Sequence, residues 1–111
     1  MSNANLKTIW KAIDEKFGID TVVLDMSKIT SMADYFVITT GQNVNQMQAI
    51  ASNVEKELQN LGVRLLHLEG SSSSWVLMDF DNVIVHIFDK EFREFYGLER
   101  LWADAKPVNV E

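Results

Sequence analysis

The stretch that decides the fold is WVLMDFDNVIVHIF, residues 75–88. Two apolar runs flank the pair Asp81-Asn82, and both residue types tolerate the positive φ angles that the centre of a type I′ turn requires. We therefore predict a β-hairpin with Asp81 and Asn82 as its turn. In this register Trp75 lies opposite Phe88, because pairing proceeds outward from the turn.

The predicted pairing sorts the hairpin side chains onto two faces, because directly opposed residues share a face. One face is wholly apolar and is expected to be core: Val76, Met78, Phe80, Val83, Val85 and Ile87. The other is aromatic, aliphatic and lightly polar: Trp75, Leu77, Asp79, Ile84, His86 and Phe88. Such a mixture is typical of a protein-binding surface. The sequence leaves open whether the C-terminal segment folds back and covers this face instead.

Periodicity and turn residues predict the elements on the N-terminal side of the hairpin. The expected elements are a helix over 6–17 stopped by Gly18, strands over 20–26 and 34–41, a helix after the cap Asn43 ended by Gly62, and a strand over 63–70. In the second helix Val44, Met47, Ala51, Val54, Leu58 and Leu61 form one apolar stripe, and Gln46 completes a capping box with Asn43. The residues Ser71–Ser74 are expected to form a short flexible loop.

The order strand, helix, strand over residues 34–70 predicts a right-handed crossover between two parallel strands. The hairpin and the strand over 20–26 add antiparallel neighbours. We therefore expect one α/β domain over residues 1–111, with a mixed sheet of about five strands and packed helices.

Composition narrows the function classes. The chain has 111 residues, no cysteine and a net charge of -6, which argues against a free-standing nucleic-acid binder and excludes thiol chemistry. No apolar run approaches the roughly 20 residues of a membrane span, and the N-terminus lacks the apolar block of a signal peptide. From Asp79 to Glu111 there are eight acidic and four basic side chains, which favours either a basic partner or simple solubility.

The segment after the hairpin is rich in aromatic residues. Asp89 can cap a short helix there, and Gly97 is expected to interrupt it. The apolar residues of this segment outnumber what one short helix can bury: Phe92, Phe95, Tyr96, Leu98, Leu101 and Trp102. Such a surplus beside an acidic surface again indicates a protein partner.

Two sets of residues could carry chemistry. Asp79 and Asp81, preceded by Gly70-Ser71, resemble the metal-binding Asp-x-Asp of a nucleotidyltransferase, but the turn takes Asp81 out of line and no third carboxylate is clearly placed. A metal-dependent nucleotidyltransferase-like enzyme using Asp79 and Asp81 is the alternative hypothesis. His67 and His86 titrate near neutrality, yet neither has a carboxylate or nucleophile at fixed spacing, which favours structural or interface roles.

The sequence resembles the ribosomal silencing factors, also called the Iojap-like family, over about Leu6 to Ala105. Four blocks carry the resemblance: Asp34-Tyr35-Phe36-Val37-Ile38, Trp75 with Asp79, Val85-His86, and Tyr96 with Leu98-Glu99 and Leu101-Trp102. The family pattern usually has Gly in the hairpin turn where this chain has Asp81. The departure puts the turn geometry in doubt but leaves the binding role untouched.

The resemblance implies a non-enzymatic protein without a cofactor, whose fold is similar to that of nucleotidyltransferases. It implies binding to the large ribosomal subunit through the L14-family ribosomal protein, which blocks joining of the small subunit and represses translation in the cytoplasm. No direct nucleic-acid or membrane binding is expected, and a homodimer of the free protein is left open. The protein-binding residues expected from it are Trp75, Leu77, Asp79, His86, Tyr96, Leu98, Glu99 and Trp102.

Overall fold

A computed structural model of the chain describes residues 3–70 and 73–110, so Ser71 and Ser72 of the predicted loop lie outside the described residues. The elements are α1 (Asn3–Glu15), β1 (Ile19–Asp25), β2 (Tyr35–Thr40), α2 (Val44–Gln59), β3 (His67–Glu69), β4 (Trp75–Asp79), β5 (Val83–Phe88), α3 (Lys90–Tyr96), α4 (Leu98–Leu101) and β6 (Lys106–Pro107). The predicted α/β class is confirmed. Among the described helices, none is long and apolar enough to cross a membrane.

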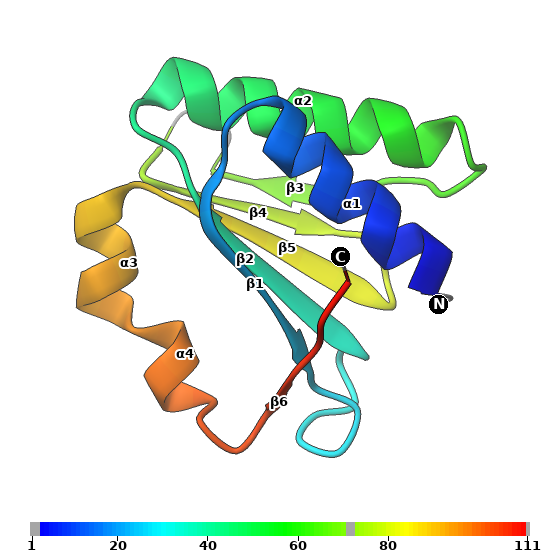
Figure 1. Cartoon of the computed structure of the whole chain (residues 1–111), viewed down its shortest axis with the longest axis vertical. Coiled ribbons are helices and arrows are strands. Elements are labelled where there is room, and N and C mark those ends of the chain that lie inside the picture. Colours follow the sequence, from blue (N-terminus) through cyan, green and yellow to red (C-terminus); the bar gives the residue numbers. More distant parts are fainter. Residues whose placement is uncertain (1–2, 71–72, 111) are drawn as a thin grey trace.

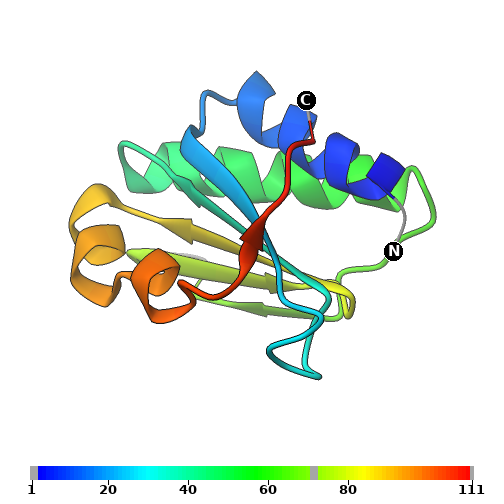
Figure 2. The same cartoon turned by 60° about the horizontal axis from the view of Figure 1, so that its bottom comes forward.

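The strands form one mixed sheet with the order β3-β4-β5-β2-β1-β6. Strands β2 and β5 are parallel at its centre, and the remaining neighbours are antiparallel. Helices α1 and α2 lie together on one face of the sheet, whereas α3 and α4 lie apart from them, beyond the other face (Figures 1 and 2). The protein therefore has three layers, of which the sheet is the middle one.

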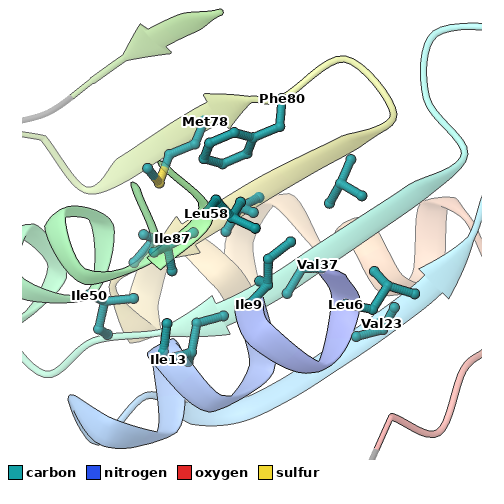
Figure 3. Close-up of a cluster of buried hydrophobic side chains, with 14 of the residues drawn as sticks. Leu6, Ile9, Ile13, Val23, Val37, Ile50, Leu58, Met78, Phe80 and Ile87 are labelled. Carbon is teal, nitrogen blue, oxygen red and sulfur yellow. The ribbon is translucent and has the colours of Figure 1, made fainter. Parts of the chain in front are cut away.

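The face under α1 and α2 holds the larger core (Figure 3). Leu6, Ile9 and Ile13 of α1 point into it with no exposed area, because their spacing places them on one side of the helix. The predicted apolar hairpin face packs here in full: Val76, Met78, Phe80, Val83, Val85 and Ile87 are all buried in this cluster. This face is called the closed face below.

The hairpin has the predicted register, with Trp75 opposite Phe88 and Asp79 opposite Ile84. Its turn differs from the type I′ expectation, because only Asp81 has a positive φ, of 76°. The N–H of Asn82 donates to the carbonyl of Phe80, which makes a γ-turn centred on Asp81. The Asn82 carbonyl instead accepts from the N–H groups of Asp34 and Tyr35, which binds the turn to the start of β2.

The predicted neighbour relation of the crossover is wrong. The strand that follows α2 does not pair with β2; the parallel partner of β2 is β5, with Tyr35 opposite Val83 and Thr40 opposite Phe88. All six residues of β5 are buried, so this strand needs a central position. Strand β3 has three exposed residues and tolerates the edge, where it pairs with β4. The short strand β6 was not predicted, and it makes a sixth strand.

The predicted helix over 6–17 and the predicted apolar stripe of the second helix are each wrong at their ends. Phe17 lies beyond the end of α1 in a left-handed conformation (φ 64°) and is 78% exposed. Val44 and Leu61, at the two ends of the predicted stripe, are exposed, whereas Ile50 is fully buried and replaces them. The cap of α2 is confirmed, since Asn43 accepts a bond from the Gln46 N–H, but the Gln46 side chain accepts from Gln42 rather than closing a capping box on Asn43.

Candidate docking surface

The second face of the sheet is only partly covered. Leu98, Ala105 and Trp102 close it on the side of β2 and β1, where they pack in a cluster with Phe36, Ile84 and Phe88. Towards β4 and β3 the cover ends. The register there places His67 beside Asp79 and Glu69 beside Leu77 on the same face. The term open face is used below for the residues that remain accessible here: His67, Glu69, Trp75, Leu77 and Asp79 of the sheet, with Phe92, Phe95 and Tyr96 of α3.

Trp75 is the centre of the open face. Its indole Nε1–H donates a hydrogen bond of 3.1 Å to Nδ1 of His86 on the neighbouring strand. Its ring stacks on Phe88 with centroids 4.9 Å apart, and the ring of Tyr96 lies 5.0 Å away. The indole is thus held on three sides by the sheet and α3, and part of it is still exposed. A rigid, partly exposed aromatic side chain of this kind is typical of interface anchors.

His86 supports Trp75 from below, since only 4% of its area is exposed. Burial lowers the pKa of this imidazole from its ordinary value of 6.5 to about 4, because the charged form loses its hydration. The neutral ring accepts from Trp75 at Nδ1 and therefore carries its proton on Nε2. That Nε2 atom is buried and has no hydrogen-bond partner within the described chain, so the tautomer is fixed by Trp75.

Helix α3 presents its aromatic residues to solvent. Asp89 caps the helix by accepting from the Phe92 N–H at 2.8 Å, and Gly97 ends it in a left-handed conformation, both as predicted. None of the seven residues of α3 is buried. Phe95 is 79% and Tyr96 45% exposed, and their rings pack edge-on 5.2 Å apart. Exposed aromatic clusters are typical of interaction sites.

The two candidate metal ligands do not converge. An oxygen of Asp79 accepts the backbone N–H of Asp81 at 2.7 Å, which makes the first carboxylate part of the turn. Within residues 3–70 and 73–110, no group of three or more His, Asp or Glu side chains is placed to hold a metal ion. His67 lies opposite Asp79 on the neighbouring strand, but its Nε2 atom pairs with Glu69, at 3.0 Å, on the exposed edge of the sheet.

The other predicted binding residues have different surroundings. Leu98 is buried, and Trp102 is half-buried with its ring 6.2 Å from that of Phe36. The carboxylate of Glu99 binds the guanidinium of Arg93 on α3, at 2.9 Å. Phe36 was not singled out from the sequence, although it contacts His86 at 4.8 Å as well as Trp102. Its signals in the sequence were its place in the predicted strand over 34–41 and in the motif block over 34–38 that carries the family resemblance.

A family-wide comparison assigns the chain. The model of the family described as "Ribosomal silencing factor during starvation" matches residues 1–111. The chain belongs to the ribosomal silencing factor family. A ribosomal silencing factor of Halalkalibacterium halodurans is 41% identical over the whole of this chain and 97% of its own length. The silencing factor of Bacillus subtilis is also 41% identical, over 96% of this chain and 91% of its own length.

A solved structure and a plant protein are also similar to this chain. A crystal structure of a protein from Chromobacterium violaceum is 34% identical and superposes with a TM-score of 0.89, covering 97% of this chain and 92% of the other. The chloroplast protein Iojap of Zea mays is 30% identical over 90% of this chain, which corresponds to 44% of the plant protein. The silencing factor family acts in translation regulation and associates with the ribosome, and its names indicate a regulatory role.

Proposed function

We propose that this chain binds the large ribosomal subunit through its L14-family ribosomal protein and sterically blocks joining of the small subunit, which represses translation. The observation that carries the proposal is the partly exposed Trp75, held between His86, Phe88 and Tyr96 on a face that the chain leaves open. Interface energy concentrates in such anchors, which bury a large aromatic area at little entropic cost.

The chemistry of the open face suits a basic protein surface. Asp79 and Glu69 flank Leu77 on the sheet, and the chain as a whole has a net charge of -6. An acidic surface steers a basic partner into contact, and the apolar side chains then supply the affinity. His86 and Leu98 are buried, so in this proposal they hold the contacting side chains in place from beneath.

A further relative supports the large subunit as the partner. The mouse protein named "Mitochondrial assembly of ribosomal large subunit protein 1" is 30% identical over 75% of this chain, which is 38% of the mouse protein. We infer from the name a shared target on the large subunit. Action there places the protein in the cytoplasm, and it requires no cofactor, membrane contact or direct contact with nucleic acid.

Sedimentation of purified subunits tests the proposal. Large and small subunits are mixed with the protein, and the gradient is examined for joined particles and for protein travelling with the large subunit. We expect fewer joined particles and cosedimentation with the large subunit alone. Unchanged joining, without protein in the large-subunit fraction, would refute the proposal.

Two variants locate the contact. Trp75→Ala and Tyr96→Ala are each expected to weaken binding by about 2 kcal/mol, roughly thirtyfold, as loss of an aromatic anchor does. Phe17→Ala is the matched control, because Phe17 is 78% exposed but follows α1, outside the open face. Equal weakening by all three variants would place the contact elsewhere. Light scattering against concentration then shows whether the same face pairs two free copies.

No observation favours the nucleotidyltransferase-like alternative. One carboxylate of the pair is bonded to the backbone of the other residue, and the family is named for a regulatory role. A regulatory and not a catalytic role is therefore proposed. Calorimetry with magnesium and nucleotide, with Asp79→Asn as the comparison, would reveal a metal site that depends on Asp79 if this proposal is wrong.

A further inference from the structure

A groove of about 1040 Å³ lies at the carboxyl ends of the central parallel strands, outside the open face. Its floor is the end of β2 at Thr40 and Gly41, where the Gly41 N–H bonds the carbonyl of Phe88 at the end of β5. Residues from the start of β1 and from α3 and α4 form its walls. Ligands of open α/β sheets bind at this end of the strands, and the volume matches pockets for small molecules.

Arg93 reaches into the groove from α3. Its Nε donates to Glu99 at 2.9 Å, and its Nη1 donates to the Thr40 hydroxyl at 2.9 Å and the Ile19 carbonyl at 3.3 Å. These bonds fix the guanidinium, and only 12% of the Arg93 side chain is exposed. Within the described residues, Nη2 of Arg93 makes no hydrogen bond and is not fully buried. A preorganised pair of N–H donors thus faces the groove.

Other charged side chains of the groove are exposed. Lys90 and Arg100 line the same wall as Arg93, and Arg100 donates only to the carbonyl of Glu94. Asp20 lines the groove from β1 in a left-handed conformation (φ 51°) that a non-glycine residue adopts at a cost. The groove therefore has charges of both signs: the cations of Lys90, Arg93 and Arg100 share their wall with the carboxylates of Glu94 and Glu99, and Asp20 lies at the start of β1.

We propose that this groove binds a small metabolite that carries one phosphate or carboxylate group and a hydrogen-bond-donating end. Arg93 Nη2 is the deepest contact of the oxyanion, since a fixed guanidinium matches its geometry, and Lys90 and Arg100 neutralise its charge. Asp20 accepts from a hydroxyl or ammonium group at the other end of the ligand. None of the open-face residues lines the groove, and of the binding residues expected from the sequence only Glu99 does so.

Titration calorimetry at low salt tests the groove with three probes: inorganic phosphate, adenosine monophosphate and glutamate. We expect at least one to bind, and the probe that binds best distinguishes a phosphate ester from a carboxylate. The double variant Lys90→Gln/Arg100→Gln removes exposed cations and leaves the Arg93–Glu99 pair intact, so it is expected to fold and to bind at least tenfold more weakly. Arg64→Gln, which removes an exposed cation outside the groove, is expected to bind as the parent does.

Asp20→Asn checks the orientation of the ligand. It is expected to weaken the binding of adenosine monophosphate or glutamate severalfold. The binding of inorganic phosphate is expected to stay unchanged, because this ion has no second end that reaches Asp20. If none of the three probes gives heat of binding up to about 10 mM, any affinity is too weak for a specific site and the proposal is overturned. Binding that persists unchanged in the double variant overturns it as well. Neither outcome changes the result expected in the sedimentation assay with ribosomal subunits, which tests the docking proposal separately.

Discussion

The two faces of the sheet are covered by helices of different kinds. On the closed face, α1 and α2 have 13 and 16 residues and bury a continuous stripe, with Ile9 and Leu58 at 0% exposure. On the other face, α3 has seven residues and buries none of them. Burial stabilises the first pair of helices, whereas a cap at Asp89 and a left-handed end at Gly97 hold α3. Helix α3 and the sheet beside it therefore leave apolar side chains exposed. This region is expected to have a lower local stability than the closed face.

The largest expected effect separates the two faces directly. Leu58→Ala on the closed face leaves a cavity in a dense core and is expected to lower the free energy of unfolding by about 2–5 kcal/mol. Leu77→Ala on the open face is expected to cost less than half as much, because the side chain is only half-buried. Urea denaturation of both variants measures the ratio, and equal losses would show that the open face is as closed as the other.

A second test uses the pH dependence of the open face. The folded pKa of His86 is about 4, below the ordinary 6.5, so the neutral ring favours the folded state. Its contribution is present above pH 6.5 and is lost as the pH falls towards 4, by up to about 1.4 kcal/mol for each pH unit. Urea midpoints between pH 7 and 5 measure the slope. His86→Phe should reduce it and His67→Gln, at the exposed histidine, should not; an equal slope in all three proteins contradicts the assignment.

The hairpin turn between β4 and β5 gives a smaller effect. Asp81→Gly is expected to raise the free energy of unfolding by up to about 1 kcal/mol, because glycine adopts a φ of 76° without the cost that an L side chain incurs. Asn82→Gly is the control, since Asn82 has no positive φ and only loses backbone restraint. Thermal or urea unfolding distinguishes them, and a loss of stability in Asp81→Gly would mean that its side chain matters to the turn.

The smallest expected effect on stability lies on α3. Phe95→Ser removes a ring that is 79% exposed and is expected to change the free energy of unfolding by no more than about 0.5 kcal/mol. The same change is expected to weaken association with the large subunit, because the ring adjoins Tyr96. A substitution that costs stability but leaves binding unchanged would reverse the roles assigned to the two faces.

The sequence predicted the parts of the fold that local rules determine. The hairpin register, the cap at Asp89 and the helix end at Gly97 follow from residues within a few positions of each other, and all three are confirmed. Sheet order does not follow from such rules. The crossover was predicted to join neighbours, whereas the fully buried strand β5 took the place beside β2 and β3 moved to the edge. Placement depended on which strand had two apolar faces to bury.

The candidate site was predicted in composition more than in arrangement. The mixed face of the hairpin identified Trp75 and its neighbours, but whether the C-terminal segment covered them depended on how α3 turns away after Asp89. It covers Ile84 and Phe88 and leaves Trp75 partly exposed. The groove was not predicted, because its residues come from three separate segments of the chain, 19–20, 40–42 and 90–100, that only the fold brings together. Arg93 gave no pattern that distinguishes it from a solvated charge.

The last residues of the chain connect the two faces. Ala105 is buried in the cluster of the open side, β6 pairs with the edge of β1, and Val110 is buried in the closed core. The six residues 105–110 thus contribute side chains to both hydrophobic clusters. Loss of this segment would remove packing from both faces of the sheet at once, so the two faces are expected to unfold in one cooperative transition.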